Sequence, residues 1–253
     1  MQSMYFHGHA CISLLGEDYH LLIDPFRAGD FEGVVDLHPI VGSFTHVAST
    51  HDHADHAHFG AAPLAHRCRG GGNDTAPFSL RRVPVWHDLH EGRLRGGLGG
   101  SLVVESAGVT VIHLGDVGEP ATAAAAAAFP PAADLLVVPC GGYYTLGANE
   151  ALDWIRMLRP RRALLCHARD QGVRLPQLAM SSECAVRMPG FPWRSVTWLE
   201  LSEAPVSGSA TEIFIARAPG ICATPAPRIS SAVNHDGCVR AISPGFDMAC
   251  CGT

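Results

Sequence analysis

The sequence contains no lysine: all 18 basic residues are arginine, against 24 acidic residues, for a formal net charge of −6 over 253 residues. This balance lacks the basic field that supplies most nucleic-acid affinity, so a general nucleic-acid binder is disfavoured. No apolar run approaches the roughly 20 residues of a membrane helix, and the first 16 residues have no basic segment leading into a long apolar one. We therefore expect a cytoplasmic protein with no integral membrane association.

The nine cysteines are an odd number for a disulfide framework, and none of them form a paired CxxC motif. Cys11, Cys140 and Cys166 lie in apolar, strand-like surroundings, where a free thiol packs as a small hydrophobic group. Reduced thiols in a reducing compartment are the expected state. Four other cysteines lie in residues 218–253, which are rich in Pro, Gly, Ser and Ala. We predict one domain over residues 1–217 and a tail over residues 218–253; a metal-binding or disulfide-linked tail is the alternative.

What the sequence has in excess is histidine, and 12 of its 15 histidines lie between His7 and His90. Such crowding indicates a functional site.

The apolar pattern predicts strands, several of which end at a histidine or an aspartate. These strands cover residues 4–6, 10–15, 19–23, 44–48, 82–85, 101–105, 110–114, 135–138, 163–166, 196–201 and 212–216. Two helices are predicted over residues 121–129 and 149–158.

The strongest motif is His51-Asp52-His53-Ala54-Asp55-His56, which follows the predicted strand 44–48. Two imidazoles two residues apart lie on the same side of an extended segment, whereas Asp55 and His56 follow the bend and face a second position. Neutral imidazole and carboxylate are the ligands expected for zinc and similar ions. One loop can therefore serve two metals. The alternative is an accidental His-rich loop in a His-rich chain.

Further ligands should come from the ends of other strands. His87 follows strand 82–85, Asp116 follows strand 110–114, and His167 follows strand 163–166. Together with the loop from His51 to His56, they predict a binuclear site along one edge of packed sheets.

This order of motifs resembles the metallo-β-lactamase superfamily over residues 4–216, and its flanking motifs look closest to the branch of ascorbate-6-phosphate lactonase and N-acyl-phosphatidylethanolamine phospholipase D type enzymes. The resemblance implies a four-layer αββα sandwich. It also implies that the first metal is bound by His51, His53 and His87. The second metal would be bound by Asp55, His56 and His167, and Asp116 would bridge the two metals. The most specific motifs are Gly8-His9-Ala10-Cys11, Leu22-Ile23-Asp24-Pro25-Phe26, His51 to His56, Val85-Trp86-His87-Asp88, His113-Leu114-Gly115-Asp116, Gly141-Gly142-Tyr143-Tyr144-Thr145 and Leu165-Cys166-His167.

Three catalytic residues are predicted beside the metals. Asp55 would hold the nucleophilic hydroxide as well as its metal, and Tyr144 would stabilise negative charge on a substrate oxygen, with simple packing as its alternative. His9 matches the near-site loop of the family and would contact the substrate or a ligand. His113 is either a partner of a ligand or a strand histidine satisfied by a backbone carbonyl.

We predict a binuclear metal-dependent hydrolase in which a metal-bridging hydroxide attacks a small ester, lactone or phosphodiester. Two divalent cations are expected, with zinc favoured, manganese second and iron third. The partner is a small-molecule substrate and not a nucleic acid, and a homo-oligomer is left open. The alternatives are an RNA-processing nuclease of the same superfamily, redox chemistry on a di-iron site, and a non-catalytic metal-dependent binding module. Arg93 and Arg95 are the nearest candidates for binding an anionic group of the substrate, with an ordinary solvated loop as the alternative.

Overall fold

The computed structural model describes residues 1, 3–27, 40, 42–70, 76–94, 96–173, 175–201 and 211–216. The chain divides into two units, Met1–Gly220 and Ile221–Thr253. The second unit, and with it the predicted tail over residues 218–253, lies outside the described residues.

The first sheet has six strands in the order β12-β1-β2-β3-β4-β5. Antiparallel pairs join β12, β1, β2 and β3, and parallel pairs join β3, β4 and β5. The bounds are β1 (Ser3–Gly8), β2 (Cys11–Leu15), β3 (His20–Ile23), β4 (His46–Ala48), β5 (His66–Arg67) and β12 (Trp198–Glu200).

The second sheet has seven strands in the order β11-β13-β10-β9-β8-β7-β6. Parallel pairs join β8 to β9, β9 to β10, β10 to β13 and β13 to β11, whereas β6, β7 and β8 form antiparallel hairpins. The bounds are β6 (Ser79–Trp86), β7 (Leu98–Ser106), β8 (Val109–His113), β9 (Leu135–Pro139), β10 (Arg162–Cys166), β11 (Trp193–Val196) and β13 (Glu212–Ala216).

The two sheets pack face to face, and the strand β9 shows why. All its residues are buried, and those from Leu135 to Val138 alternate between two hydrophobic clusters. Leu135 and Val137 pack against the six-stranded sheet in one cluster, and Leu136 and Val138 pack against the helices in the other. A strand that is covered on both faces is expected to be apolar throughout.

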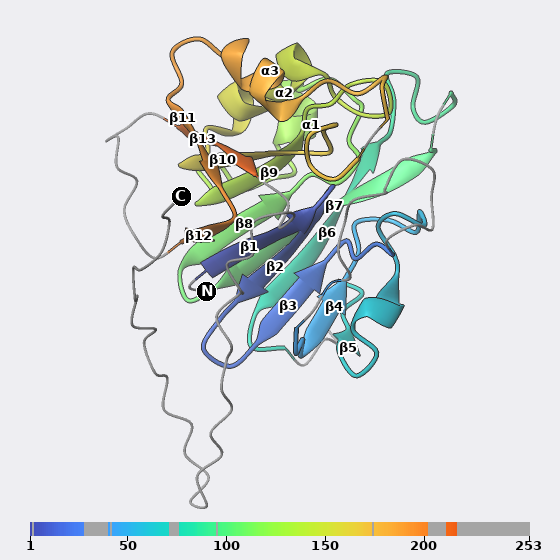
Figure 1. Cartoon of the computed structure of the whole chain (residues 1–253), viewed down its shortest axis with the longest axis vertical. Coiled ribbons are helices and arrows are strands. Elements are labelled where there is room, and N and C mark those ends of the chain that lie inside the picture. Colours follow the sequence, from blue (N-terminus) through green and yellow to red (C-terminus); the bar gives the residue numbers. More distant parts are fainter. Residues whose placement is uncertain are drawn as a thin grey trace, which may run out of the picture. The chain divides into compact units, whose positions relative to one another are not determined.

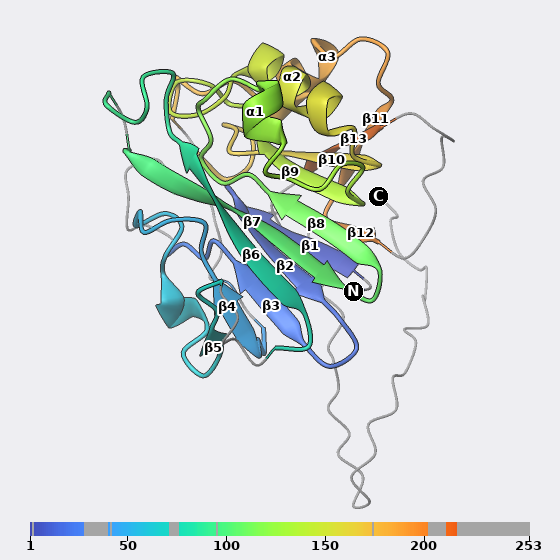
Figure 2. The same cartoon turned by 180° about the vertical axis from the view of Figure 1, so that it is seen from behind.

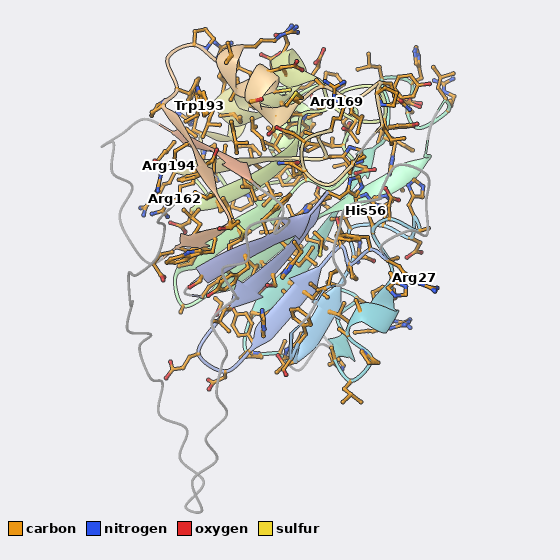
Figure 3. The ribbon with its side chains drawn as sticks, viewed as in Figure 1. Arg27, His56, Arg162, Arg169, Trp193 and Arg194 are labelled. Atoms are coloured by element: carbon orange, nitrogen blue, oxygen red, sulfur yellow. The ribbon has the colours of Figure 1, made fainter. Side chains whose placement is uncertain are left out.

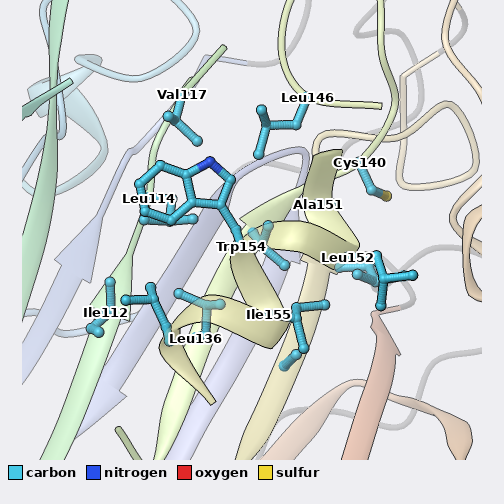
Figure 4. Packing of buried hydrophobic residues seen from close by; sticks show 14 of the residues in the cluster. Ile112, Leu114, Val117, Leu136, Cys140, Leu146, Ala151, Leu152, Trp154 and Ile155 are labelled. Atoms are coloured by element: carbon cyan, nitrogen blue, oxygen red, sulfur yellow. The ribbon is translucent and has the colours of Figure 1, made fainter. Parts of the chain in front are cut away.

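Three α-helices, α1 (Ala123–Ala126), α2 (Ala148–Leu158) and α3 (Ser181–Val186), lie on the outer face of the seven-stranded sheet (Figure 1), as the reverse view also shows (Figure 2). In α2, the buried residues are Ala151, Leu152, Trp154, Ile155 and Leu158. Their spacing forms one apolar stripe. Trp154 lies at the centre of this packing (Figure 4). The helix ends at Leu158, and the capping residue Arg159 has φ +49° and precedes a proline.

The outer face of the six-stranded sheet is covered differently. Its described cover includes the 3₁₀ turn η1 (Phe59–Ala61) and the segment of Val173 and Leu178, which pack on Cys11 and Leu22. The predicted sandwich of two sheets packed face to face is confirmed. Within the part of the chain that the structure describes, no helix has the length and apolar character needed to cross a membrane.

One predicted strand, residues 196–201, is wrong as a single element. The chain changes sheets at Thr197: β11 ends at Val196 in the seven-stranded sheet, and β12 begins at Trp198 in the other. The backbone carbonyl of Thr197 accepts a hydrogen bond from the amide of Phe6 at 3.0 Å. The two short elements α3 and β5 were not predicted, because neither carries a clear periodic pattern over its length.

Candidate metal centre

The predicted ligands meet at one edge of the sandwich, where β4, β6, β8 and β10 end. They form two groups, and within each group the ligand atoms all lie within 4.8 Å of one another. The outer group, as we name it, is His51, His53, His87 and Asp116, and the inner group is His9, Asp55, His56 and His167. Figure 3 labels His56 of the inner group.

The outer group combines the histidine loop with the ends of β6 and β8. The His51 Nε2 and His53 Nδ1 atoms lie 3.0 Å apart, and the His51 Nε2 atom lies 3.8 Å from the Asp116 Oδ2 atom. The imidazole of His87 contacts both other rings, with centroids 4.7 Å from that of His51 and 4.9 Å from that of His53. His53 is exposed. The outer group is therefore open to solvent at this histidine.

The inner group is more deeply placed. The His56 Nε2 atom lies 3.4 Å from Asp55 Oδ2 and 3.2 Å from Asp116 Oδ1. The His167 Nε2 atom lies 3.6 Å from Asp116 Oδ2. Asp116 thus reaches residues of both groups, as a bridging ligand would.

Two buried atoms test whether a cation fits here. His56 Nε2 and Asp116 Oδ1 face each other at 3.2 Å, yet neither has a hydrogen-bond partner among the described residues. Buried polar atoms without partners are rare and costly. Two ligand atoms that share a cation about 2.1 Å away would lie about 3.0–3.4 Å apart. The residues present therefore fit a divalent cation.

Asp24, which follows β3 and precedes Pro25, organises both groups by hydrogen bonds. Its carboxylate accepts hydrogen bonds from the Thr50 amide at 2.6 Å and the Thr50 hydroxyl at 2.8 Å. It also lies 2.9 Å from the Nδ1 atom of His56. The Thr50 hydroxyl lies 2.9 Å from the Nδ1 atom of His51. One buried carboxylate therefore orients a histidine in each group and leaves the Nε2 atom of each facing the centre.

Burial and neighbouring charges shift the pKa values of the site. Burial lowers the pKa of His51 to about 3 and that of His167 to about 4. Burial also opposes the charge on His56, but Asp116, Asp24 and Asp55 outweigh it and raise the pKa of His56 well above its ordinary value. For Asp116, the charges of His56 and His167 outweigh burial and lower the pKa. His51 and His167 are thus neutral and Asp116 is ionised, the protonation states that metal binding requires, whereas His56 must release its proton when a cation binds.

Backbone conformation also marks the site. His9, Asp24 and His167 have φ values of +53°, +52° and +53°. Residues with side chains rarely adopt this region, and such conformations concentrate at functional sites. Two glycines lie so close to the His87 ring that a side chain at either position would collide with it. A Cβ atom on Gly96 or Gly99 would lie 2.4 or 2.5 Å from its imidazole nitrogens.

The structure brings together all seven residues predicted as ligands and adds His9, predicted as a catalytic residue, to the inner group. The His9 Nε2 atom lies 2.9 Å from Asp55 Oδ2. Tyr144 lies on the loop after β9, and its hydroxyl accepts a hydrogen bond from Gln177 Nε2 at 2.9 Å. The roles of these residues as ligands and catalysts remain predictions.

Sequence reasoning missed Thr50 and Gln171. Thr50 directly precedes the histidine motif, so its hydroxyl could have been recognised as a partner for the first imidazole. Gln171 is fully buried, and its side-chain amide bonds to the Leu165 carbonyl at 2.7 Å and to the Ala168 amide at 3.2 Å. It supports the backbone around His167, and no local pattern signals this role.

The comparisons with known proteins agree with this architecture. The model of the β-lactamase superfamily domain matches residues 3–167. A UPF0173 metal-dependent hydrolase of Natranaerobius thermophilus is 29% identical over 217 residues, which cover 73% of this chain and 96% of the relative. A UPF0173 metal-dependent hydrolase of Pyrococcus furiosus is 26% identical over 201 residues, covering 66% and 84%.

Solved structures show the same fold. A proposed Zn-dependent hydrolase of the metallo-β-lactamase superfamily from Thermotoga maritima has a TM-score of 0.63 at 24% identity, covering 86% of this chain and all of that one. The metallo hydrolase Igni18 of Ignicoccus hospitalis has a TM-score of 0.56 at 16% identity, covering 87% and 96%.

The chain belongs to the β-lactamase superfamily. The predicted class of enzyme, a metal-dependent hydrolase of this superfamily, is confirmed at that level by the curated relatives and the family match.

Proposed function

We propose that this protein is a binuclear hydrolase that uses two divalent cations, with zinc favoured, to cleave a small ester, lactone or phosphodiester. The observation that carries the proposal is the pair of four-residue ligand groups, which lie at one sheet edge and are joined by Asp116. Imidazole and carboxylate ligands of this kind suit zinc and, with more oxygen ligands, manganese.

When bound, the cations would polarise a carbonyl or phosphoryl oxygen and lower the pKa of a water molecule to near neutrality. The chain's own residues prepare that chemistry. Asp55 lies between His56 and His9 and is partly exposed, so its carboxylate can accept a hydrogen bond from a nucleophilic water on the solvent side. The Tyr144 hydroxyl, already an acceptor for Gln177, can donate its proton to a substrate oxygen.

The surroundings favour an uncharged ester or lactone within this substrate range. Arg93 bonds to the carbonyl of His90 at 2.9 Å and to Glu91 at 3.3 Å, which competes with its predicted role in binding an anion. Leu89 and Leu94 of the same loop are exposed, as is Tyr143 after β9. Arg95 lies outside the described residues. The finer relation to the ascorbate-6-phosphate lactonase and phospholipase D type branch is part of this proposal and rests on the sequence motifs.

A cytoplasmic location and a small-molecule partner belong to the same proposal. Cys11, Cys140, Cys166 and Cys184 are buried free thiols, which supports a reducing compartment. The lack of lysine and the net charge of −6 weigh against an RNA substrate.

The test is elemental analysis of protein purified without chelator, followed by a panel of esters, lactones and phosphodiesters. We expect about two equivalents of divalent metal and measurable hydrolysis. His53→Ala and Asp55→Ala should abolish most activity, whereas His58→Ala, a histidine of the same loop outside both groups, should retain it.

The proposal fails if the protein holds two equivalents of metal and both ligand variants hydrolyse the panel as fast as the wild type. Tight metal binding without turnover would favour a binding module. Iron alone, together with oxygen consumption, would favour a redox enzyme, and RNA binding would favour a nuclease.

A further inference from the structure

His113 lies near both ligand groups and belongs to neither. It is the last residue of β8, is completely buried, and has both ring nitrogens engaged. The Gly115 amide donates a hydrogen bond to its Nδ1 atom at 3.0 Å, and its Nε2 atom donates to the carbonyl of Ala10 at 2.8 Å. Of the two interpretations left open by the sequence, the structure shows the bond to a backbone carbonyl.

The two bonds define one protonation state of the ring. A backbone amide can only donate, so Nδ1 must carry a lone pair, and a carbonyl can only accept, so Nε2 must carry the proton. His113 therefore makes both contacts as a neutral imidazole with the proton on Nε2.

Each backbone partner of His113 adjoins a carboxylate-bearing part of the site. Gly115 directly precedes Asp116, which reaches both ligand groups. Ala10 directly follows His9, whose imidazole holds Asp55 at 2.9 Å. The imidazole thus joins β8 of one sheet to the β1–β2 turn of the other.

Both segments that His113 joins are held in uncommon conformations. His9 has φ +53° and Gly115 has φ +61°, and a Cβ atom on Gly115 would lie 2.8 Å from the Gly100 carbonyl and from the Thr50 side chain. A strained residue such as His9 persists only where surrounding contacts determine its conformation, and the bond from His113 to Ala10 is such a contact. Gly115 adopts its positive φ without steric cost, so its bond to His113 restricts a backbone that glycine leaves free.

We propose that His113 is a positioning residue that sets the distance between Asp116 and the His9–Asp55 pair and thereby the affinity of both cation sites. The inference rests on the proposed binuclear function. His113 itself touches no cation; it acts through Gly115 on the carboxylate shared by the groups, and through Ala10 on the inner group alone.

Two conservative variants separate these two arms. In His113→Asn, the side-chain oxygen takes the place of Nδ1 and keeps the bond from Gly115, while the bond to Ala10 is lost. In His113→Gln, the side-chain amide takes the place of Nε2 and keeps the bond to Ala10, while the bond from Gly115 is lost.

The experiment is a stepwise titration of metal-free protein with Zn²⁺ or Co²⁺, in which the step that survives in His53→Ala identifies the inner site. We expect His113→Asn to weaken the inner site about 10- to 100-fold and to spare the outer one, and His113→Gln to weaken both. Hydrogen exchange in the metal-free protein gives a second readout: the Gly115 amide should exchange faster in His113→Gln than in His113→Asn.

A matched control is His20→Asn, which removes a histidine whose Nε2 atom bonds to Ser13 on the six-stranded sheet. It should leave both metal affinities unchanged. The inference is overturned if the wild type binds two cations and His113→Asn and His113→Gln have the same effect as each other on each site. It is also overturned if neither variant weakens either site. If the wild type binds fewer than two, the proposed function fails instead, and the exchange of the Gly115 amide still tests the contact.

Discussion

The inner and outer ligand groups contain the same kinds of residue but differ in how the protein holds them. In the inner group, three histidines are buried, His56 bonds to Asp24, and the ring of His9 contacts that of His167 at a tilt of 45° with centroids 4.2 Å apart. In the outer group, His53 is exposed, and its Nδ1 atom faces His51. Each group has three buried residues, and the fourth is an exposed histidine in the outer group but a partly exposed aspartate, Asp55, in the inner group. The inner group is thus the more enclosed of the two, and the outer group is the more open to solvent.

This difference predicts different roles for the two groups at the same sheet edge. A buried, hydrogen-bonded group holds its cation in fixed geometry, because partners of the ligands restrict their orientation. A group with an exposed ligand leaves room for exchange and for substrate. Asp116 and Asp24 connect the groups, so the two positions should respond together to changes at these aspartates and separately to changes elsewhere.

The largest expected effect is that of Asp116→Ala, which tests whether the groups are joined. Removal of the carboxylate that reaches both should lower the metal content to one equivalent or less and reduce kcat/KM about 1,000-fold, since cation stabilisation of a transition state is worth several kcal/mol. Elemental analysis and steady-state kinetics measure both effects. Two cations held with wild-type affinity would show that Asp116 is not shared.

A paired comparison of His56→Ala and His53→Ala tests the difference in burial. Loss of His56 leaves the carboxylates of Asp24 and Asp116 buried without their main positive partner, so the free energy of unfolding should fall by about 3–5 kcal/mol. Loss of the exposed His53 should change it by less than about 0.5 kcal/mol.

Denaturant unfolding in the presence of a chelator measures this difference without a contribution from bound metal, and both variants should lose most activity. Equal destabilisation by the two substitutions would contradict the distinction between a core group and a surface group.

Asp24→Asn tests the second connection between the groups at a smaller cost. The amide oxygen can still accept from the Thr50 amide, but the negative charge beside His56 is lost. We expect about 1–3 kcal/mol of destabilisation and a 10- to 100-fold loss of metal affinity. The loss should be larger at the inner site, because Asp24 contacts His56 directly and His51 only through Thr50; stepwise titration checks this order.

The sequence was sufficient to predict which residues would meet, because each ligand follows an apolar strand. His87, Asp116 and His167 follow β6, β8 and β10, and the carboxyl ends of strands that share an edge lie together. It was not sufficient to predict the partners of these ligands. The contact of His113 with Ala10 crosses between the sheets, and that of His9 with Asp55 joins two loops of the six-stranded sheet. Both depend on tertiary packing. The break at Thr197 was missed for the same reason, since residues 196–201 are uniformly strand-forming and only pairing shows that they divide.

The smallest expected effect concerns a third group of histidines, which lies away from the metal centre and so gives the comparison a reference without metal. His7 and His20 both bond through Nε2 to the Ser13 hydroxyl, at 2.9 and 3.0 Å. Burial, with His20 close by, lowers the pKa of His7 from its ordinary 6.5 to about 4. Between these values the unfolded chain binds the proton and the folded chain does not, so the free energy of unfolding falls as the pH drops from 6.5 towards 4 and is unaffected by this group above 6.5.

His7→Gln keeps a hydrogen-bonding side chain that does not titrate. In the presence of a chelator, the wild type should lose on the order of 2 kcal/mol more than this variant between pH 7 and pH 4.5, with allowance for the partial exposure of the ring. Equal losses would show that His7 is not held neutral in the folded protein.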